Sequence, residues 1–237
     1  MSVRAVIFDK DGTVLDFDAF WLPIAVKATE VITSKLGISD VPSEKILESM
    51  GLVDGVASIN GSICFGTYRD MAEDMNGVFR NFGYSFDIEK LTELTVEAYH
   101  TSTDAGEIKP TCENIEEVMQ SLKKKGITLV LITSDGPVMT DKCLKGLGID
   151  RYFDLVITDD GTHPNKPDPF MINKLCDDYK LDKSEIIMVG DTLTDMNFAI
   201  NGGIRSVGLA KTEENKAILL DETDTVVQDI SCLLNVI

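Results

Sequence analysis

From residue 108 to residue 209, amphipathic helical stretches alternate with short apolar runs, and this alternation limits the fold more than any other feature. Two of the apolar runs are ITLVLIT at 127–133 and EIIMVG at 185–190. Near-continuous apolar strands that alternate with helices form parallel sheets covered by helices on both faces. The pattern predicts an α/β fold with a parallel sheet, to which the apolar run at Ala5–Phe8 is also expected to belong.

Residues 17 to 106 interrupt this pattern. Their periodicity is helical throughout, with breaks at glycines and no convincing buried strand. The first strand is therefore separated from the rest of its sheet by a helical insertion. We expect a core domain made of residues 1–16 and 107–237 and a helical domain made of residues 17–106.

Charge and composition narrow the classes of partner. The chain has 22 Lys and Arg against 40 Asp and Glu, a formal net charge of -18, which would repel nucleic acid and anionic membranes. No apolar stretch approaches the roughly 20 residues that span a bilayer, and the start of the chain lacks the pattern of a signal peptide. The five scattered cysteines favour reduced thiols. We expect a cytoplasmic protein that binds a small molecule, while its oligomeric state is unknown from the sequence.

Polar residues follow several of the predicted strands, at the sheet edge where ligands bind in parallel sheets. Asp9 and Asp11 come directly after the first strand. Residues i and i+2 of a strand point the same way, so these two carboxylates are expected to share one small space, where a cation or a shared proton must compensate their charge. The other polar residues expected at this edge are Thr133, Ser134, Lys166, Asp191 and Asp195.

Together these residues indicate an oxygen-lined site for a hard cation beside a phosphate-sized anion pocket. Each has an ordinary structural explanation as well. Asp-Gly after a strand is often only a turn, and Asp191 and Asp195 are also suited to the start of a helix. The functional interpretation is favoured because four unrelated coincidences would otherwise fall at one sheet edge in chain order.

The segments that carry these residues are FDKDGT, LVLITS, NKPDP and VGDTLTD. They resemble, in order, the four motifs of the haloacid dehalogenase superfamily, in particular its phosphoglycolate phosphatase-like and β-phosphoglucomutase-like members. The resemblance spans residues 3 to 195. It implies a Rossmann-like parallel sheet core and a helical cap inserted after the first motif.

The resemblance also implies a function, that of a phosphatase acting on a small phosphorylated metabolite such as phosphoglycolate or a sugar phosphate. Asp9 would be the nucleophile that forms an aspartyl-phosphate, and Asp11 would be the general acid and then the general base. Thr133, with Ser134 beside it, would bind the phosphoryl group, and Lys166 would neutralise its charge.

The same resemblance implies Mg²⁺ as cofactor. Its ligands would be the Asp9 carboxylate, the backbone carbonyl of Asp11 and the Asp191 carboxylate, while Asp195 would orient Lys166 or a metal-bound water. Lys10 departs from the family, in which an apolar residue is common at this position. As the middle residue of D-x-D it is expected to face away from the pocket.

Other functions stay open. A phosphosugar mutase would carry nearly the same core motifs. A phosphonate hydrolase would need a reactive lysine in the cap, and nothing singles out Lys27, Lys35 or Lys45. A dehalogenase is disfavoured because the second acid, Asp11, is present. A non-enzymatic receiver-like phospho-acceptor is disfavoured by the length of the chain and its insertion. Candidate substrate contacts in the insertion are Trp21, Tyr68, Arg69, Tyr84 and Phe86.

Overall fold

The computed structural model describes residues 2–237, which divide into two compact units. The core unit contains the described chain up to Asp16 together with Ile108–Ile237. The inserted unit is Phe17–Glu107. At the connection, the Asp16 N–H donates to the carbonyl of Lys109 at 2.8 Å, so the segment that leaves the core unit lies beside the segment that returns to it.

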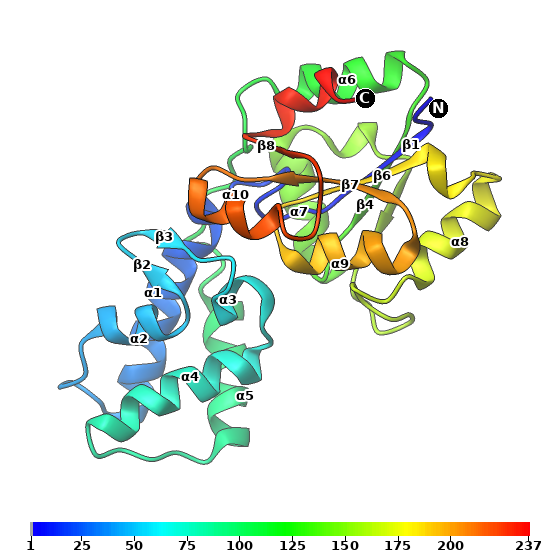
Figure 1. The fold of residues 1–237 in the computed structure, drawn as a ribbon. Coiled ribbons are helices and arrows are strands. Elements are labelled where there is room, and N and C mark those ends of the chain that lie inside the picture. Colours follow the sequence, from blue (N-terminus) through cyan, green and yellow to red (C-terminus); the bar gives the residue numbers. More distant parts are fainter. Residues whose placement is uncertain (1) are drawn as a thin grey trace. The chain divides into compact units, whose positions relative to one another are not determined.

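The core unit is built on a six-stranded sheet in the order β5-β4-β1-β6-β7-β8, in which every neighbouring pair is parallel (Figure 1). The α/β fold with a parallel sheet is thereby confirmed. Strand β1 lies between β4 and β6 in the sheet, although the inserted unit separates it from both of them in the sequence. The strands are β1 Ala5–Phe8, β4 Thr128–Ile132, β5 Leu155–Ile157, β6 Ile186–Gly190, β7 Arg205–Leu209 and β8 Val226–Val227.

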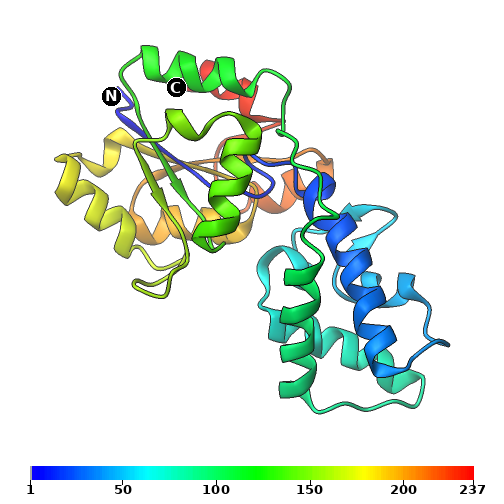
Figure 2. The same ribbon diagram turned by 180° about the vertical axis from the view of Figure 1, so that it is seen from behind.

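Helices cover both faces of this sheet, as the apolar strands require. Successive residues of β1 alternate between the faces: Val6 and Phe8 pack in a cluster with α6, while Ala5 and Ile7 pack in a cluster with α8 and α9. Figures 1 and 2 show these helices on opposite sides of the strands. The helices are α6 Ile115–Lys124, α7 Pro137–Leu147, α8 Phe170–Tyr179, α9 Leu193–Gly202 and α10 Glu213–Leu219, with 3₁₀ turns at Asp150–Tyr152, Lys183–Glu185 and Ile230–Asn235.

The inserted unit is mainly helical. Its helices are α1 Phe17–Leu36, α2 Ser43–Ser49, α3 Ser62–Phe65, α4 Tyr68–Asn81 and α5 Ile88–Thr101. Contrary to the expectation of helices alone, it also contains a small antiparallel hairpin of β2 Leu52–Val53 and β3 Val56–Ala57. Strands of two residues are too short to show a period, but the intervening Asp54-Gly55, both with positive φ, is a known hairpin-turn pair. Within residues 2–237, no helix has both the length and the apolarity needed to cross a membrane.

Candidate active site

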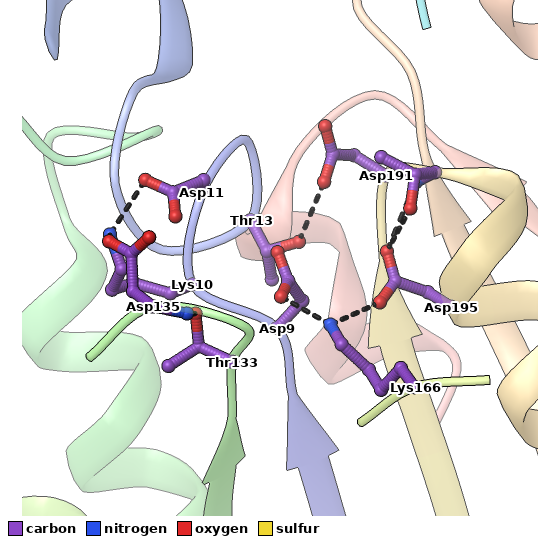
Figure 3. A network of polar contacts seen from close by, with 10 residues as sticks. Asp9, Lys10, Asp11, Thr13, Thr133, Asp135, Lys166, Asp191 and Asp195 are labelled. Atoms are coloured by element: carbon purple, nitrogen blue, oxygen red, sulfur yellow. Dashed lines mark hydrogen bonds and ion pairs between the residues drawn. The ribbon is translucent and has the colours of Figure 1, made fainter. Parts of the chain in front are cut away.

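The site lies at the carboxyl end of the core sheet, where β1, β4 and β6 end side by side (Figure 3). Asp9 follows β1, Thr133 follows β4, and Asp191 follows β6. The three strands are adjacent and parallel, so residues more than a hundred positions apart reach one edge of the sheet. The sheet edge expected from the sequence is therefore the one at which these side chains meet.

Lys166 connects two carboxylates of the site. Its Nζ lies 2.5 Å from Asp9 Oδ1 and 2.6 Å from Asp195 Oδ1. The lysine side chain is only 5% exposed, although it comes from a loop between β5 and α8. Burial acts to lower the pKa of Lys166, but the carboxylates of Asp195 and Asp9 outweigh it and raise the pKa above its ordinary value. The ammonium group is therefore a fixed positive charge at the base of the site.

Asp195 has two roles in the structure. It is the third residue of helix α9, and its Oδ2 accepts hydrogen bonds from the Thr192 N–H at 3.1 Å and the Thr192 hydroxyl at 2.8 Å. This capping box fixes the carboxylate while its other oxygen accepts from Lys166. The helix-start explanation and the expected contact with Lys166 therefore both hold. Thr192 is not among the residues expected at the site from the sequence, although the pattern T-x-x-D is similar to that of a capping box.

Two glycines make room for the acidic side chains. A Cβ on Gly12 would lie 1.9 Å from Asp191 Oδ2, and a Cβ on Gly190 would lie 2.3 Å from Asp195 Cγ. Gly12 also has a φ of +76°, which a residue with a side chain rarely adopts. The close approach of the Gly12 backbone places the loop after β1 directly against Asp191.

Thr13 adds a polar contact to this loop. Its buried hydroxyl donates to Asp191 Oδ1 at 3.3 Å, and its carbonyl accepts from the Thr111 hydroxyl at 2.6 Å. Thr13 is not among the residues expected at the site from the sequence. Its hydroxyl links Asp191, which follows β6, to the loop that follows β1.

Asp9, Asp191 and Asp195 form the acidic centre of the site, since carboxylate oxygens of all three lie within 4.8 Å of one another. Burial raises the pKa of Asp9 to about 7, Lys166 opposes this rise, and Asp195 and Asp11 add to it. Burial, followed by the charges of Asp9 and Asp195, raises the pKa of Asp191 well above its ordinary value. So much buried negative charge with one lysine fits a hard divalent cation, which prefers carboxylate oxygens.

Asp11 pairs with its neighbour in the sequence, Lys10. Its carboxylate is turned toward Lys10, with Oδ1 2.7 Å from Lys10 Nζ, and it is not among the three clustered carboxylates just described (Figure 3). The charge of Asp11 still adds to the rise in the pKa of Asp9, although β1 ends at Phe8 and the two carboxylates have different partners. Strict alternation applies only within a strand.

Lys10 is the charged partner of Asp11. Its side chain is fully buried and contacts both Asp11 and Asp135, the latter at 2.9 Å. Burial acts to lower the pKa of Lys10, but Asp11 and Asp135 raise it above the ordinary value. A lysine expected to face away from the pocket is therefore a charged neighbour of the candidate acid–base residue.

The loop after β4 contains the two hydroxyls expected to bind phosphate. Thr133 is buried, and its Oγ1 accepts a hydrogen bond from the Asp135 N–H at 3.2 Å. Ser134 is exposed. The fixed hydroxyl of Thr133 therefore makes it the better-ordered of the two.

The candidate residues of the inserted unit mostly make contacts within that unit. Tyr68 packs edge-on against Tyr99, and Arg69 pairs with Glu73 and Glu89. Tyr84 and Phe86 stack, and Trp21 packs against Phe20. Among the lysines, Lys27 pairs with Asp104, Lys35 pairs with Glu97, and Lys45 lies over the Phe82 ring. None of these contacts selects one lysine as a reactive amine.

The chain is similar in sequence and in fold to known proteins. A model of the haloacid dehalogenase-like hydrolase family matches residues 3–203. The chain is 26% identical over 240 residues to the phosphoglycolate phosphatase of Vibrio parahaemolyticus serotype O3:K6, covering 100% of this chain and 96% of that protein. It is 29% identical over 244 residues to the pyrophosphatase PpaX of Bacillus velezensis, covering 99% and 96%.

A solved structure has a similar fold. It comes from Haemophilus somnus 129pt and is named a predicted phosphoglycolate phosphatase. It superposes with a TM-score of 0.74 at 16% identity and covers 100% of this chain and 98% of its own. The likeness covers the core sheet and the inserted helices alike.

Proposed function

The chain belongs to the haloacid dehalogenase-like hydrolase family, and from this premise we propose that it is a Mg²⁺-dependent phosphatase of a small phosphorylated metabolite. The family and the phosphatase names of its relatives support a phosphoric monoester hydrolase. The observation that carries the proposal is the pair of contacts from Lys166 to Asp9 and Asp195, at 2.5 and 2.6 Å. They hold one carboxylate, that of Asp9, at the strand end next to a fixed positive charge.

In this proposal Asp9 is the nucleophile. Its carboxylate oxygen forms a bond to phosphorus while the bond from phosphorus to the ester oxygen breaks, and Asp11 gives a proton to the departing alcohol. Water then attacks the aspartyl-phosphate, Asp11 takes the proton of that water, and inorganic phosphate leaves. Two easier displacements replace one difficult displacement, as is usual in covalent catalysis.

Lys166 and Thr133 would stabilise the transferring group. Negative charge is spread over the phosphoryl oxygens in the transition state, so a buried ammonium and a fixed hydroxyl stabilise it without reorganisation. Both groups are already ordered in the structure, Lys166 by its two carboxylates and Thr133 by its buried position and its contact with Asp135. We assign Ser134 a lesser part because its side chain is exposed.

The acidic centre supports Mg²⁺ as the cation. Asp9 and Asp191, together with the backbone carbonyl of Asp11, would hold it, and Asp195 would remain with Lys166. When bound, Mg²⁺ supplies positive charge to the phosphoryl oxygens. The raised pKa values of Asp9 and Asp191 support this assignment, because burial and then the neighbouring carboxylates disfavour the ionised forms, and a bound cation would offset both effects.

We further propose that the inserted unit acts as a cap that selects the substrate. Support comes from its point of insertion: the chain leaves the core unit at Asp16, seven residues after Asp9, and returns at Ile108. A unit attached this close to the nucleophile is well placed to exclude water and to contact the substrate on closing.

A panel of phosphorylated metabolites tests the function, with release of inorganic phosphate as the readout and Asp9→Asn as the blank. The panel includes phosphoglycolate, pyrophosphate and a hexose 1-phosphate. Phosphate release that the Asp9 variant lacks is the expected result. Conversion of the hexose 1-phosphate to its 6-phosphate without net phosphate release would instead identify a mutase, and no turnover of any compound would refute the phosphatase.

A further inference from the structure

The side chain of Lys10 is fully buried beside the site and has no part in the mechanism above. We infer that Lys10 is a positioning residue that holds the carboxylate of Asp11 in place for its acid–base role. This inference rests on the proposed function, in which Asp11 protonates the leaving alcohol and activates water.

The contacts of Lys10 tie it to Asp11 on one side and to the loop after β4 on the other. Its Nζ lies 2.7 Å from Asp11 Oδ1 and 2.9 Å from Asp135 Oδ2. The carboxylates of Asp11 and Asp135 are each about one fifth exposed, whereas the lysine is not exposed at all. The fixed partner is therefore the lysine, and the two carboxylates at the surface of the site are oriented by it.

The backbone around Lys10 is also fixed. The Lys10 carbonyl accepts hydrogen bonds from the N–H groups of Val14 and Leu15, both at 2.9 Å. These bonds close the loop that carries Asp11, so the lysine side chain starts from a rigid point. Because the backbone of Lys10 is fixed and its side chain is buried, the ammonium group has little freedom to move, as an orienting contact requires.

Asp135 links this pair to the phosphate-binding loop. Its N–H donates to Thr133 Oγ1 at 3.2 Å, and its carbonyl accepts from the Asp159 N–H at 2.9 Å. Lys10 therefore connects the acid–base residue of the first motif with the loop that contains Thr133. Such a connection would keep the proton donor at a constant distance from the phosphoryl group.

A purely structural explanation competes with this inference. Burying a lysine costs side-chain entropy and the desolvation of its charge, and an apolar residue would avoid the desolvation. If Lys10 served only to neutralise Asp135, then removing both charges together would restore the protein completely. If Lys10 orients Asp11, removing both would restore the stability alone. The two explanations therefore differ in a double variant.

The experiment compares Lys10→Met, Asp135→Asn and the double variant with the wild type, using p-nitrophenyl phosphate and thermal melting. Methionine has an unbranched side chain one atom shorter than that of lysine and carries no charge. We expect Lys10→Met to melt at a lower temperature and to lose about 10-fold to 10²-fold in kcat, which reaches only the lower end of the range for general acid–base catalysis. Its kcat/KM should stay close to that of the wild type, because the first step with this ester needs no proton donor. Asp135→Asn keeps the contact of Lys10 with Asp11 and is expected to lose much less in kcat than Lys10→Met.

The double variant decides the question. We expect it to melt near the wild-type temperature while its steady-state rate stays low after a burst of about one nitrophenol per enzyme, because the dephosphorylation step needs Asp11 as the base. Wild-type kcat in the double variant, or a rise in KM that accounts for the whole loss in Lys10→Met, would overturn the inference and leave the phosphatase intact. Absence of turnover by the wild type would overturn the proposed function itself.

Discussion

Lys166 and Asp9, which are 157 residues apart in the sequence, meet at 2.5 Å between Nζ and Oδ1 at the carboxyl end of the core sheet. Lys166 lies nine residues after the end of β5, in the loop that leads to α8, so only the path of that loop brings it there. This contact gives the candidate nucleophile a fixed direction. Variants of Asp9 and of its neighbours in the site therefore test the role of each residue.

Replacing Asp9 by Asn removes the nucleophile and keeps the shape of the side chain. We expect kcat to fall on the order of 10³-fold or more for every ester, as happens when a covalent nucleophile is lost. Circular dichroism and thermal melting should show a folded protein, because the amide oxygen still accepts from Lys166. Turnover at the wild-type rate in Asp9→Asn would place the nucleophile elsewhere.

Replacing Asp11 by Asn should slow the two chemical steps to different degrees. Nitrophenol leaves without protonation, so with p-nitrophenyl phosphate the first step is largely spared while hydrolysis of the aspartyl-phosphate loses about 10² to 10⁴-fold. The variant should give a burst of about one nitrophenol per enzyme and a chain heavier by one phosphoryl group on Asp9. Intact and peptide mass measurements check this. Phosphate found on Thr133 or Ser134 instead would contradict the assignment.

Removal of divalent cations should abolish activity, and Mg²⁺ should restore it. The clustered carboxylates of Asp9, Asp191 and Asp195 repel one another without a cation, so Mg²⁺ should also stabilise the fold, by about 2.7 kcal/mol at a concentration of 100 Kd. Melting with and without Mg²⁺ measures this, and Asp191→Asn should lose most of the shift. Ca²⁺ should inhibit because its looser coordination misplaces the nucleophile. Full activity in excess chelator would exclude the metal.

Substituting Gly12 by Ala should disturb the site through Asp191. The new Cβ would lie 1.9 Å from Asp191 Oδ2, and the φ of +76° adds strain of about 1–2 kcal/mol. Gly126→Ala is the matched control, since Gly126 has a φ of +77° and no neighbour within 4 Å of its would-be Cβ. Both variants should lose stability, but only Gly12→Ala should also lose activity and Mg²⁺ binding. Equal effects of the two substitutions would mean that the contact with Asp191 is unimportant.

Replacing the inserted unit, Phe17–Glu107, by a short glycine linker tests its role as a cap. The linker is feasible because Asp16 and Lys109 are hydrogen-bonded at 2.8 Å. In a protein shown to fold, kcat/KM should fall much more for the best metabolite of the panel than for p-nitrophenyl phosphate. Equal losses on both substrates would mean that the unit does not select the substrate.

Much of the fold could be predicted from the sequence, because apolar runs and helical periodicity are local properties of the chain. Apolar runs such as 127–133 and 185–190 contain the strands β4 and β6, and the helical periods on either side contain α6 through α9. The hairpin at Leu52–Ala57 was missed because two-residue strands have no period. Strand β8, at Val226–Val227, was missed for the same reason.

The sequence by itself determined which residues end the strands, since a change from apolar to polar residues marks each strand end of the site. Only the tertiary structure decided the partners of those residues. The sheet order places β1 between β4 and β6, and this brings Asp9 and Asp191 together. Beyond Phe8 the chain no longer alternates, so Asp11 turns to a buried Lys10 that also binds Asp135, 125 residues away in the sequence. Contacts between distant segments depend on packing and loop geometry, and no local period of the sequence encodes them.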